Sequence, residues 1–469
     1  MTQVNDVRDA HVETTPARAV SPWQPLSQPV FRMLWIATVV SNVGSWMSDV
    51  GINWSMLTLS ADPLDIALVQ AASSLPMFLF ALPSGVMADI VDRRKYLLFS
   101  QLWVFIAAAG LTVLSFTGHV TPTVLLVATF LLSVGAAMSS PPFQAVVPDL
   151  GVAWVLWRWR PAPSIQRLPP EHFFSAVRTG IRYVHAAPVL RNVLVRTVSF
   201  FVFGSAGWAL LPLVARRELG LGPAGYGVML ACIGLGAIAG AILLPRLRQR
   251  LNADRLMVAA SLVFALTMLV LAFVRHVWLL NMFEFFTGFA WIAVLSTLNL
   301  GAQRSAARWV KARALAVYLT VFFGSMTTGS AIWGQIASRF GTPTALVVAT
   351  LGMVLASATV FRWKLEKDPE LNLDLSGQPL DGVEIDLPNE RGPVLVSHEY
   401  IIDPHNAKAF LQAVHELRRV RRRAGAMSWA VYEDIERPGL FIETFLMGSW
   451  IEHLRQQERH TMNDLLLQS

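Results

Sequence analysis

Charged residues and cysteine are both scarce in this sequence. Only 15% of its 469 residues are charged and 54% are hydrophobic, whereas a soluble domain carries about 25% charged residues. This composition excludes an ordinary water-soluble protein. The single cysteine, Cys232, lies inside an apolar run, so an intrachain disulfide and a metal cluster built on thiolates are both excluded. We therefore expect neither a metal site nor a cofactor.

Sequence patterns of catalysis, ATP use and secretion are also missing. The sequence has no phosphate-binding loop, no Walker lysine and no catalytic triad pattern, which predicts that the chain is not an enzyme and is not driven by ATP. The first thirty residues contain acids and prolines but no apolar segment of a signal peptide. We expect residues 1–30 to form a cytoplasmic tail.

Long apolar runs, by contrast, fill most of the chain between residues 31 and 361. A helix that crosses the hydrocarbon core of a bilayer needs about 20 residues. The runs therefore predict an all-α polytopic membrane protein surrounded by the lipid bilayer. Ten spans are expected, at residues 31–59, 65–88, 96–117, 122–147, 193–215, 223–245, 255–275, 277–300, 312–338 and 342–361.

The cations indicate how these spans are oriented. Lys and Arg concentrate in short cytoplasmic loops of membrane proteins, so the net charge of +7 does not require a nucleic-acid partner. They cluster in alternate loops, at Arg93, Arg94 and Lys95; Arg158, Arg160, Arg167, Arg178 and Arg182; Arg246, Arg248, Arg250 and Arg255; Arg304, Arg308, Lys311 and Arg313; and Arg362, Lys364 and Lys367. The other loops contain Arg216, Arg217, Arg275 and Arg339. This pattern predicts a multi-pass protein with both termini in the cytoplasm.

One cytoplasmic loop, between the second and third spans, carries a recognisable pattern. Its spacing matches the signature Gly-x-x-x-Asp-Arg-x-Gly-Arg-Arg of the major facilitator superfamily at Gly85, Asp89, Arg93 and Arg94. The chain resembles this superfamily, although Ile90 and Asp92 replace its usual Arg and Gly. The resemblance implies two helix bundles that rock around a central site, with Asp89 latching onto the start of the span at Ala312. The alternative is that the loop residues only cap and anchor helix ends.

Two further segments, 42–47 and 140–150, resemble the bacterial branch that includes enterobactin exporters. The resemblance to this branch implies a location in the bacterial inner membrane and secondary-active export driven by protons. We therefore expect protons and a small siderophore- or drug-like molecule as partners. A second, degenerate copy of the loop signature stands at residues 240–248 and lacks the acid.

The number of spans departs from this family. Its members have two bundles of six spans, whereas four spans precede the basic loop here and six follow it. The seven apolar residues at 151–157 resemble the end of the family's sixth span but are too few to cross a bilayer. We infer that the fifth span and most of the sixth are missing. The alternatives are that 151–157 forms a re-entrant piece, or that two copies of the chain complete each other.

These boundaries divide the membrane part into three segments. Residues 31–150 form an incomplete N-terminal bundle, residues 151–192 a basic cytoplasmic loop, and residues 193–361 a C-terminal bundle of six helices. Because an even number of spans is missing, every later span keeps its orientation.

Ionisable groups within membrane spans are costly to bury and are functional candidates for that reason. Asp49 and Glu284 lie inside predicted spans, and a carboxylate with a raised pKa can bind and release a coupling proton. Asn42 and Ser45 precede Asp49 at helical spacing, so with Trp46 they form a candidate cavity. The alternative is that either acid lies near the outer surface and is solvated and inert.

Aromatic residues of the spans allow two interpretations. They could line a cavity for a large, partly apolar ligand, or form lipid-facing belts at the membrane interface. The residues concerned are Trp46, Trp54, Trp208, Trp291 and Trp333.

Beyond residue 361 the composition becomes polar. Residues 362–391 read as a linker rich in acids, Pro and Gly, and residues 392–469 as a small α+β domain with the order strand, helix, strand, strand, helix. This pattern and the segment 449–457 resemble the ferredoxin-like modules of the antibiotic biosynthesis monooxygenase type. Such modules commonly pair, which implies a homodimer through this domain.

Two sets of side chains in this tail domain were considered as binding residues. The histidines have no metal-ligand spacing and indicate a surface role rather than a metal or haem site; they are His398, His415, His453 and His460. The arginines near the end of the predicted helix 404–423 either bind anionic lipid or stabilise the helix end through its dipole; they are Arg418, Arg419, Arg421, Arg422 and Arg423.

Two functions are consistent with the sequence. The favoured one is a proton-driven, secondary-active exporter of small organic molecules that works by alternating access. The alternative is a membrane anchor whose tail domain acts as a ligand sensor or a small enzyme, with transport impaired by the missing hairpin.

Overall fold

The fold is that of a computed structural model, which describes residues 29–90, 93–138, 187–305, 311–365, 392–423, 425–450 and 452–453. The segment 151–157, most of the linker and most of the expected closing helix lie outside these residues. Among these residues, 29–47 belong to a different compact unit from the rest.

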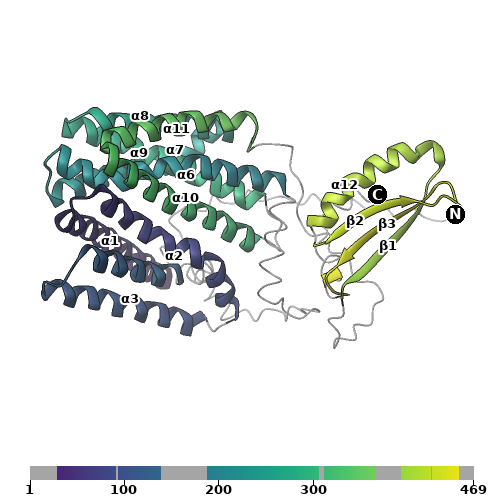
Figure 1. The fold of residues 1–469 in the computed structure, drawn as a ribbon, viewed down its shortest axis with the longest axis horizontal. Coiled ribbons are helices and arrows are strands. Elements are labelled where there is room, and N and C mark those ends of the chain that lie inside the picture. The colour runs from purple at the N-terminus through teal and green to yellow at the C-terminus, as the bar shows by residue number, and fades with distance from the viewer. Residues whose placement is uncertain are drawn as a thin grey trace, which may run out of the picture. The chain divides into compact units, whose positions relative to one another are not determined.

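Among the described residues, helices occupy all ten predicted spans (Figure 1). They are α1 (Pro29–Leu59), α2 (Pro63–Ile90), α3 (Arg93–Phe116), a helix at Pro122–Met138, α6 (Pro188–Leu213) followed by the π-helical turn η2 (Val214–Glu218), α7 (Pro223–Arg250), α8 (Ala253–Phe273), α9 (Val277–Arg304), α10 (Lys311–Phe340), and α11 (Thr342–Ser357) followed by the short helix η4 (Ala358–Phe361). Eight of them are long and apolar enough to cross a membrane. The first helix after the basic loop begins earlier than predicted because Pro188 provides a favourable first turn.

Helices α6 to α11 form one bundle, drawn in teal and green in Figure 1. An aromatic cluster fills its interior. The Phe201 ring meets those of Phe322 and Trp291 edge to face, with centroids 4.4 and 5.1 Å away, and Phe200 meets Phe264 at 5.3 Å. Such pairs add about 0.5–1.5 kcal/mol each beyond their burial. The cluster joins α6, α8, α9 and α10 into a common core.

Glycine allows α7 and α9 to approach closely. A Cβ atom at Gly236 would collide with the backbone of Phe285, and one at Gly288 with the backbone of Ile233. Apolar lipid provides no hydrophobic drive for helices to associate, so close packing of small residues supplies much of the attraction. These two glycines are therefore required by the packing of this helix pair.

The N-terminal helices meet this bundle chiefly where α2 packs against α10. A Cβ atom at Gly324 of α10 would lie 2.8 Å from the Phe78 ring of α2, and one at Gly334 would lie 2.5 Å from the Cβ atom of Ala67. Small residues on α10 thus accept side chains of α2. The contact forms one continuous seam between the two halves of the membrane part.

The tail domain has a three-stranded antiparallel sheet, β1 (Val394–Ile401), β2 (Ser428–Glu433) and β3 (Leu440–Met447), in the order β1-β3-β2. The helix α12 (Ala407–Arg423) connects β1 to β2 and lies along the sheet (Figure 1). The order of these four elements is the one that the sequence predicts.

A buried ion pair joins this helix to the sheet. The carboxylate of Glu443 in β3 has no exposed surface and accepts hydrogen bonds from Arg421 Nε at 3.1 Å, Trp429 Nε1 at 2.8 Å and the Tyr400 hydroxyl at 3.0 Å. Burial opposes its ionisation, but the hydrogen bonds and charge of Arg421, with the other two donors, hold the pKa of Glu443 below its ordinary value. The carboxylate is therefore charged and fully paired.

Replacing Glu443 by Gln should destabilise the tail domain by about 3–5 kcal/mol, because the buried guanidinium of Arg421 loses its counter-charge. Hydrogen exchange of the β3 amides in the full-length chain measures this, with the exposed Glu433→Gln as the control. Unchanged protection of β3 in Glu443→Gln would contradict the account.

The same ion pair predicts how the domain responds to acid. The folded pKa of Glu443 is lowered, so its stabilisation is present above the ordinary value of 4.5 and is lost as the pH falls through the lower, folded value. Protection of β3 should therefore decrease below about pH 4 in the native chain. The Glu443→Gln variant should lack this component of the acid dependence.

Candidate functional site

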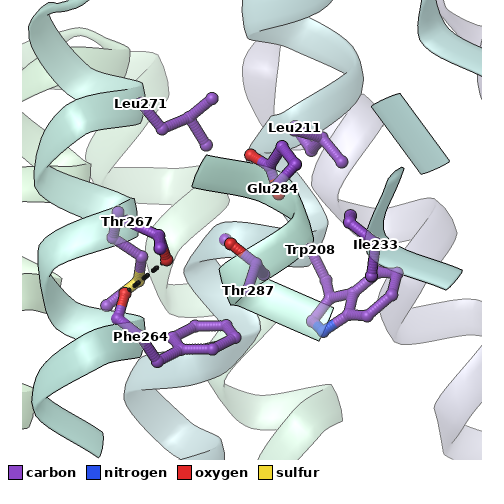
Figure 2. Close-up of a pocket in the computed structure, with 10 residues that line it drawn as sticks. Trp208, Leu211, Ile233, Phe264, Thr267, Leu271, Glu284 and Thr287 are labelled. Carbon is purple, nitrogen blue, oxygen red and sulfur yellow. Dashed lines mark hydrogen bonds between the residues drawn. The ribbon is translucent and has the colours of Figure 1, made fainter. Parts of the chain in front are cut away.

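A buried acid lies between helices of the C-terminal bundle. Glu284 of α9 is 3% exposed and borders a pocket between α6, α7, α8 and α9. Figure 2 shows its carboxyl group above Thr287, with Thr267 of α8 and Trp208 of α6 around the same space. The pocket holds about one water molecule. Among the described residues no Lys, Arg or His side chain pairs with Glu284.

The neighbouring hydroxyl group is arranged to hydrogen-bond this acid. Thr287 is a hydrogen-bonding neighbour of the Glu284 carboxyl group, and its hydroxyl also lies 3.3 Å from the carbonyl oxygen of Phe283, to which it donates. The Thr287 hydroxyl can donate to an ionised Glu284 carboxylate or accept a hydrogen bond from the protonated acid. The neighbouring hydroxyl can therefore hydrogen-bond both protonation states of Glu284.

The other candidate acid, Asp49 of α1, is exposed at the surface of the helices. Both it and Glu284 lie close enough to Tyr226 of α7 to act electrostatically on its hydroxyl. Tyr226 is itself buried. The structure thus brings the two acids near one residue that the sequence analysis did not single out, since a lone tyrosine in an apolar span carries no pattern.

The remaining sequence candidates are placed only in part. Trp46 is exposed, and the side chains of Asn42 and Ser45 lie outside the described residues. Gly85 and Asp89 end α2, and Arg93 and Arg94 begin α3, so the loop stands between the two expected helices. Its side chains, and that of Ala312, are not described, and the contact expected between them stays a prediction.

Three of the tryptophans expected to line a cavity or face lipid lie in the packed interior of the C-terminal bundle. Trp291 is part of the aromatic cluster, with its ring 5.3 Å from that of Trp208. Trp333 is 4% exposed and donates to the carbonyl oxygen of Val202 at 2.7 Å. These three residues are packed inside the C-terminal bundle, and Trp208 alone among them borders the Glu284 pocket.

A second polar cluster joins the two halves at the end of α1. Arg217 of the π-helical turn η2 donates to the carbonyl oxygen of Ala61, in the loop between α1 and α2. The N–H of Leu64, the Ser338 side chain and the charge of Arg217 together hold the pKa of Asp62 below its ordinary value. We call this set, formed by Ala61, Asp62, Arg217 and Ser338, the outer latch, because the charge pattern of the loops predicts that this end faces outward.

The cations beside the outer latch also have local partners. The guanidinium of Arg216 lies 5.7 Å from the centroid of the Trp54 ring. Arg275 pairs with Glu218 at 3.0 Å and donates to the carbonyl oxygens at the end of α8. These contacts explain why cations occur in loops that the charge pattern assigns to the outer side. Here they serve to connect and cap helices.

Comparison with known proteins identifies the class of membrane protein. The chain matches the family described as transmembrane secretion effector over residues 20–153 and 149–469. It is 28% identical to a staphyloferrin A transporter of Staphylococcus aureus over 109 residues, 23% of this chain and 28% of that protein. It is also 20% identical to the multidrug efflux pump Tap of Mycolicibacterium fortuitum over 408 residues, 74% of this chain and 98% of that protein.

The first of these relatives, and the 24% identical macrolide efflux protein A of Streptococcus pyogenes, are matched over less than a third of their own length. A solved bacterial homolog of the human lysosomal transporter Spinster has the same fold, with a TM-score of 0.52 at 11% identity, over 71% of this chain and 97% of that structure.

These matches confirm the resemblance to the superfamily and favour a transporter over an enzyme. The chain is an integral membrane transporter for a small-molecule substrate, and it belongs to the transmembrane secretion effector family of the major facilitator superfamily.

Proposed function

We propose that this transporter exports small, siderophore- or drug-like organic molecules across a bacterial inner membrane, driven by protons. Relatives named as a multidrug efflux pump, a macrolide efflux protein and a staphyloferrin A transporter support the substrate class. The cations of alternate loops support a topology with both termini in the cytoplasm. The enterobactin-exporter likeness of segments 42–47 and 140–150 agrees with this assignment.

The burial of Glu284 is the observation that carries the coupling mechanism. An ionised carboxylate without a cation is very costly inside a bilayer, so the acid either takes up a proton or must be reached by water. If Glu284 is enclosed in one conformation of the transporter and reached by water in another, it binds a proton from one side of the membrane and releases it to the other. Glu284 is thus a stronger candidate than the exposed Asp49.

Replacing Glu284 by Gln should abolish efflux driven by a pH gradient while the protein stays folded, because Gln has the shape of the protonated acid but cannot release a proton. Ethidium efflux from energised cells measures the effect, and thermal unfolding in detergent checks the fold. Asp49→Asn should reduce efflux less. The proposal fails if Glu284→Gln exports at the native rate, and coupling is reassigned if only Asp49→Asn is inactive.

The outer latch supports alternating access. It connects the loop between α1 and α2 with the ends of α6 and α10, and it lies at the opposite end of α2 from the signature loop of Asp89. Latches at the two ends, used in turn, allow one end to open while the other stays closed. The α2–α10 seam then serves as the surface on which the halves rock.

Replacing Arg217 by Gln should favour opening at the outer end. Val50 of α1 packs against the C-terminal core, so a cysteine placed there in a Cys232→Ser background reports separation of α1 from that core. An impermeant maleimide added outside should label Val50→Cys several-fold faster when Arg217→Gln is present. Arg275→Gln, which leaves the latch intact, is the matched control. Equal labelling rates in all three proteins would exclude a gating role for Arg217.

The missing hairpin remains part of this proposal. The two pieces of the family match meet at residues 149–153, where the sequence analysis places the loss. The alignment with Tap extends over 408 positions but uses only 74% of the 469 residues of this chain. The aligned part of this chain is therefore shorter than the alignment, and several tens of positions in Tap have no counterpart here. Two spans need about 40 residues. This deficit fits the loss of a fifth span and most of a sixth.

Self-association through the tail domain is also proposed. One face of its sheet carries exposed apolar side chains, among them Leu395, Ile401 and Tyr432. Covering such an exposed apolar face removes it from water, which lowers the free energy of the protein. This supports a homodimer of ferredoxin-like modules.

A further inference from the structure

The orientation of α12 on its sheet is fixed by one ion pair and three apolar residues. Val414, Leu417 and Val420 are buried against the sheet. Arg421, one residue further, also turns inward, and its Nη2 donates to Glu443 at 3.2 Å. The five arginines that the sequence presents as one group therefore do not act together, because Arg421 is already neutralised in the interior.

The opposite side of α12 is exposed and basic. Lys408, Arg418 and Arg422 are exposed, with the exposed Gln412 between them. None of the three cations has an ion-pair partner among the described residues. The side chains of Arg419, Arg423 and Glu416 lie outside that part of the structure. We call Lys408, Arg418 and Arg422 the basic face.

Acids of the domain that could compete for this face lie elsewhere. Glu399 is in β1 on the sheet surface that faces away from Glu443, as the alternating register of the strands requires. Glu433 and Glu436 are at the turn between β2 and β3. Among the described residues, none of these three acids forms an ion pair with Lys408, Arg418 or Arg422.

The chain keeps this face within reach of the membrane. The backbone N–H of Leu365, just after the last span, donates to the buried carboxylate of Asp254 at 3.1 Å, and Asn192 donates to the carbonyl oxygen of Lys364 at 2.9 Å. The tether thus begins at a fixed point of the bundle. At about 3.5 Å per residue, the connection from Leu365 to Gly392 spans at most about 95 Å, so the tail domain cannot leave the neighbourhood of the bilayer.

We propose that the basic face of α12 binds the headgroups of anionic phospholipids in the cytoplasmic leaflet. Its exposed cations complement a negatively charged surface, and the tether supplies the high local concentration that makes a weak contact effective. The proposal rests on the cytoplasmic location of the tail that belongs to the proposed function. The contact would hold the tail domain against the membrane beside the transporter.

The test uses the full chain with Cys232→Ser and a fluorophore on Gln412→Cys, reconstituted into nanodiscs. The discs contain phosphatidylcholine alone or mixed with phosphatidylglycerol, and a small fraction of lipid carries a nitroxide quencher on its headgroup. Quenching should be strong with phosphatidylglycerol, weak without it, and reduced by added salt. Equal quenching in both kinds of disc would overturn the proposal.

Two variants test whether the lipid contact depends on the cations of the basic face or only on the net charge of the tail domain. Replacing both Arg418 and Arg422 by Gln should weaken the lipid contact roughly 30-fold, since two cations near the surface are removed. The exposed Arg437→Gln, at the turn between β2 and β3, removes a charge without touching α12 and should keep native quenching. Native quenching in the double variant would refute the role of the basic face.

The Gln412→Cys variant also tests the lipid contact separately from the cytoplasmic location of the tail, on which the contact depends. In intact cells, an impermeant maleimide should fail to label Gln412→Cys from outside. Labelling would show that the tail is not cytoplasmic, which would contradict both the proposed topology and the proposed lipid contact. Protected cysteine with no quenching in phosphatidylglycerol discs would reject the lipid contact alone and leave the exporter unaffected.

Discussion

The cost of placing polar groups in an apolar medium is the constraint on which the rest of this structure depends. It requires the backbone of each span to satisfy its hydrogen bonds within a helix, and it favours glycines such as Gly236 and Gly288 where two helices gain by close contact. It also explains the local partners of Arg216 and Arg275 at the outer end. Glu284 is the exception, a buried acid without a described cation, and it is there that we place the coupling chemistry.

Much of the fold follows from the sequence because hydrophobic length and loop charge are strong signals. Helices occupy the positions of the ten predicted spans, eight of them long and apolar enough to cross a membrane, and the first four elements of the tail domain follow the expected order. The superfamily resemblance, drawn from Gly85, Asp89, Arg93 and Arg94, is confirmed by the family match. The side-chain contacts of that loop stay a prediction.

The site was less accessible to sequence reasoning, because spacing along one helix does not show which neighbour a side chain meets. Position within a predicted span marks both Asp49 and Glu284 as candidates, but it does not reveal that Glu284 is the buried one. Trp291 and Trp333 belong to a packed core rather than a cavity or a lipid belt. Likewise, a run of arginines does not reveal that Arg421 alone faces Glu443, since that depends on the register of β3 beneath α12.

We propose that the chain transports its substrate although its N-terminal bundle lacks one helical hairpin. Purified chain in liposomes, with an imposed pH gradient and ethidium outside, tests this proposal most directly. For protein oriented with its cytoplasmic side outward, the account predicts that ethidium accumulates when the lumen is acidic and that a protonophore abolishes this. Accumulation no greater than in protein-free liposomes, or equal accumulation without a gradient, would contradict it.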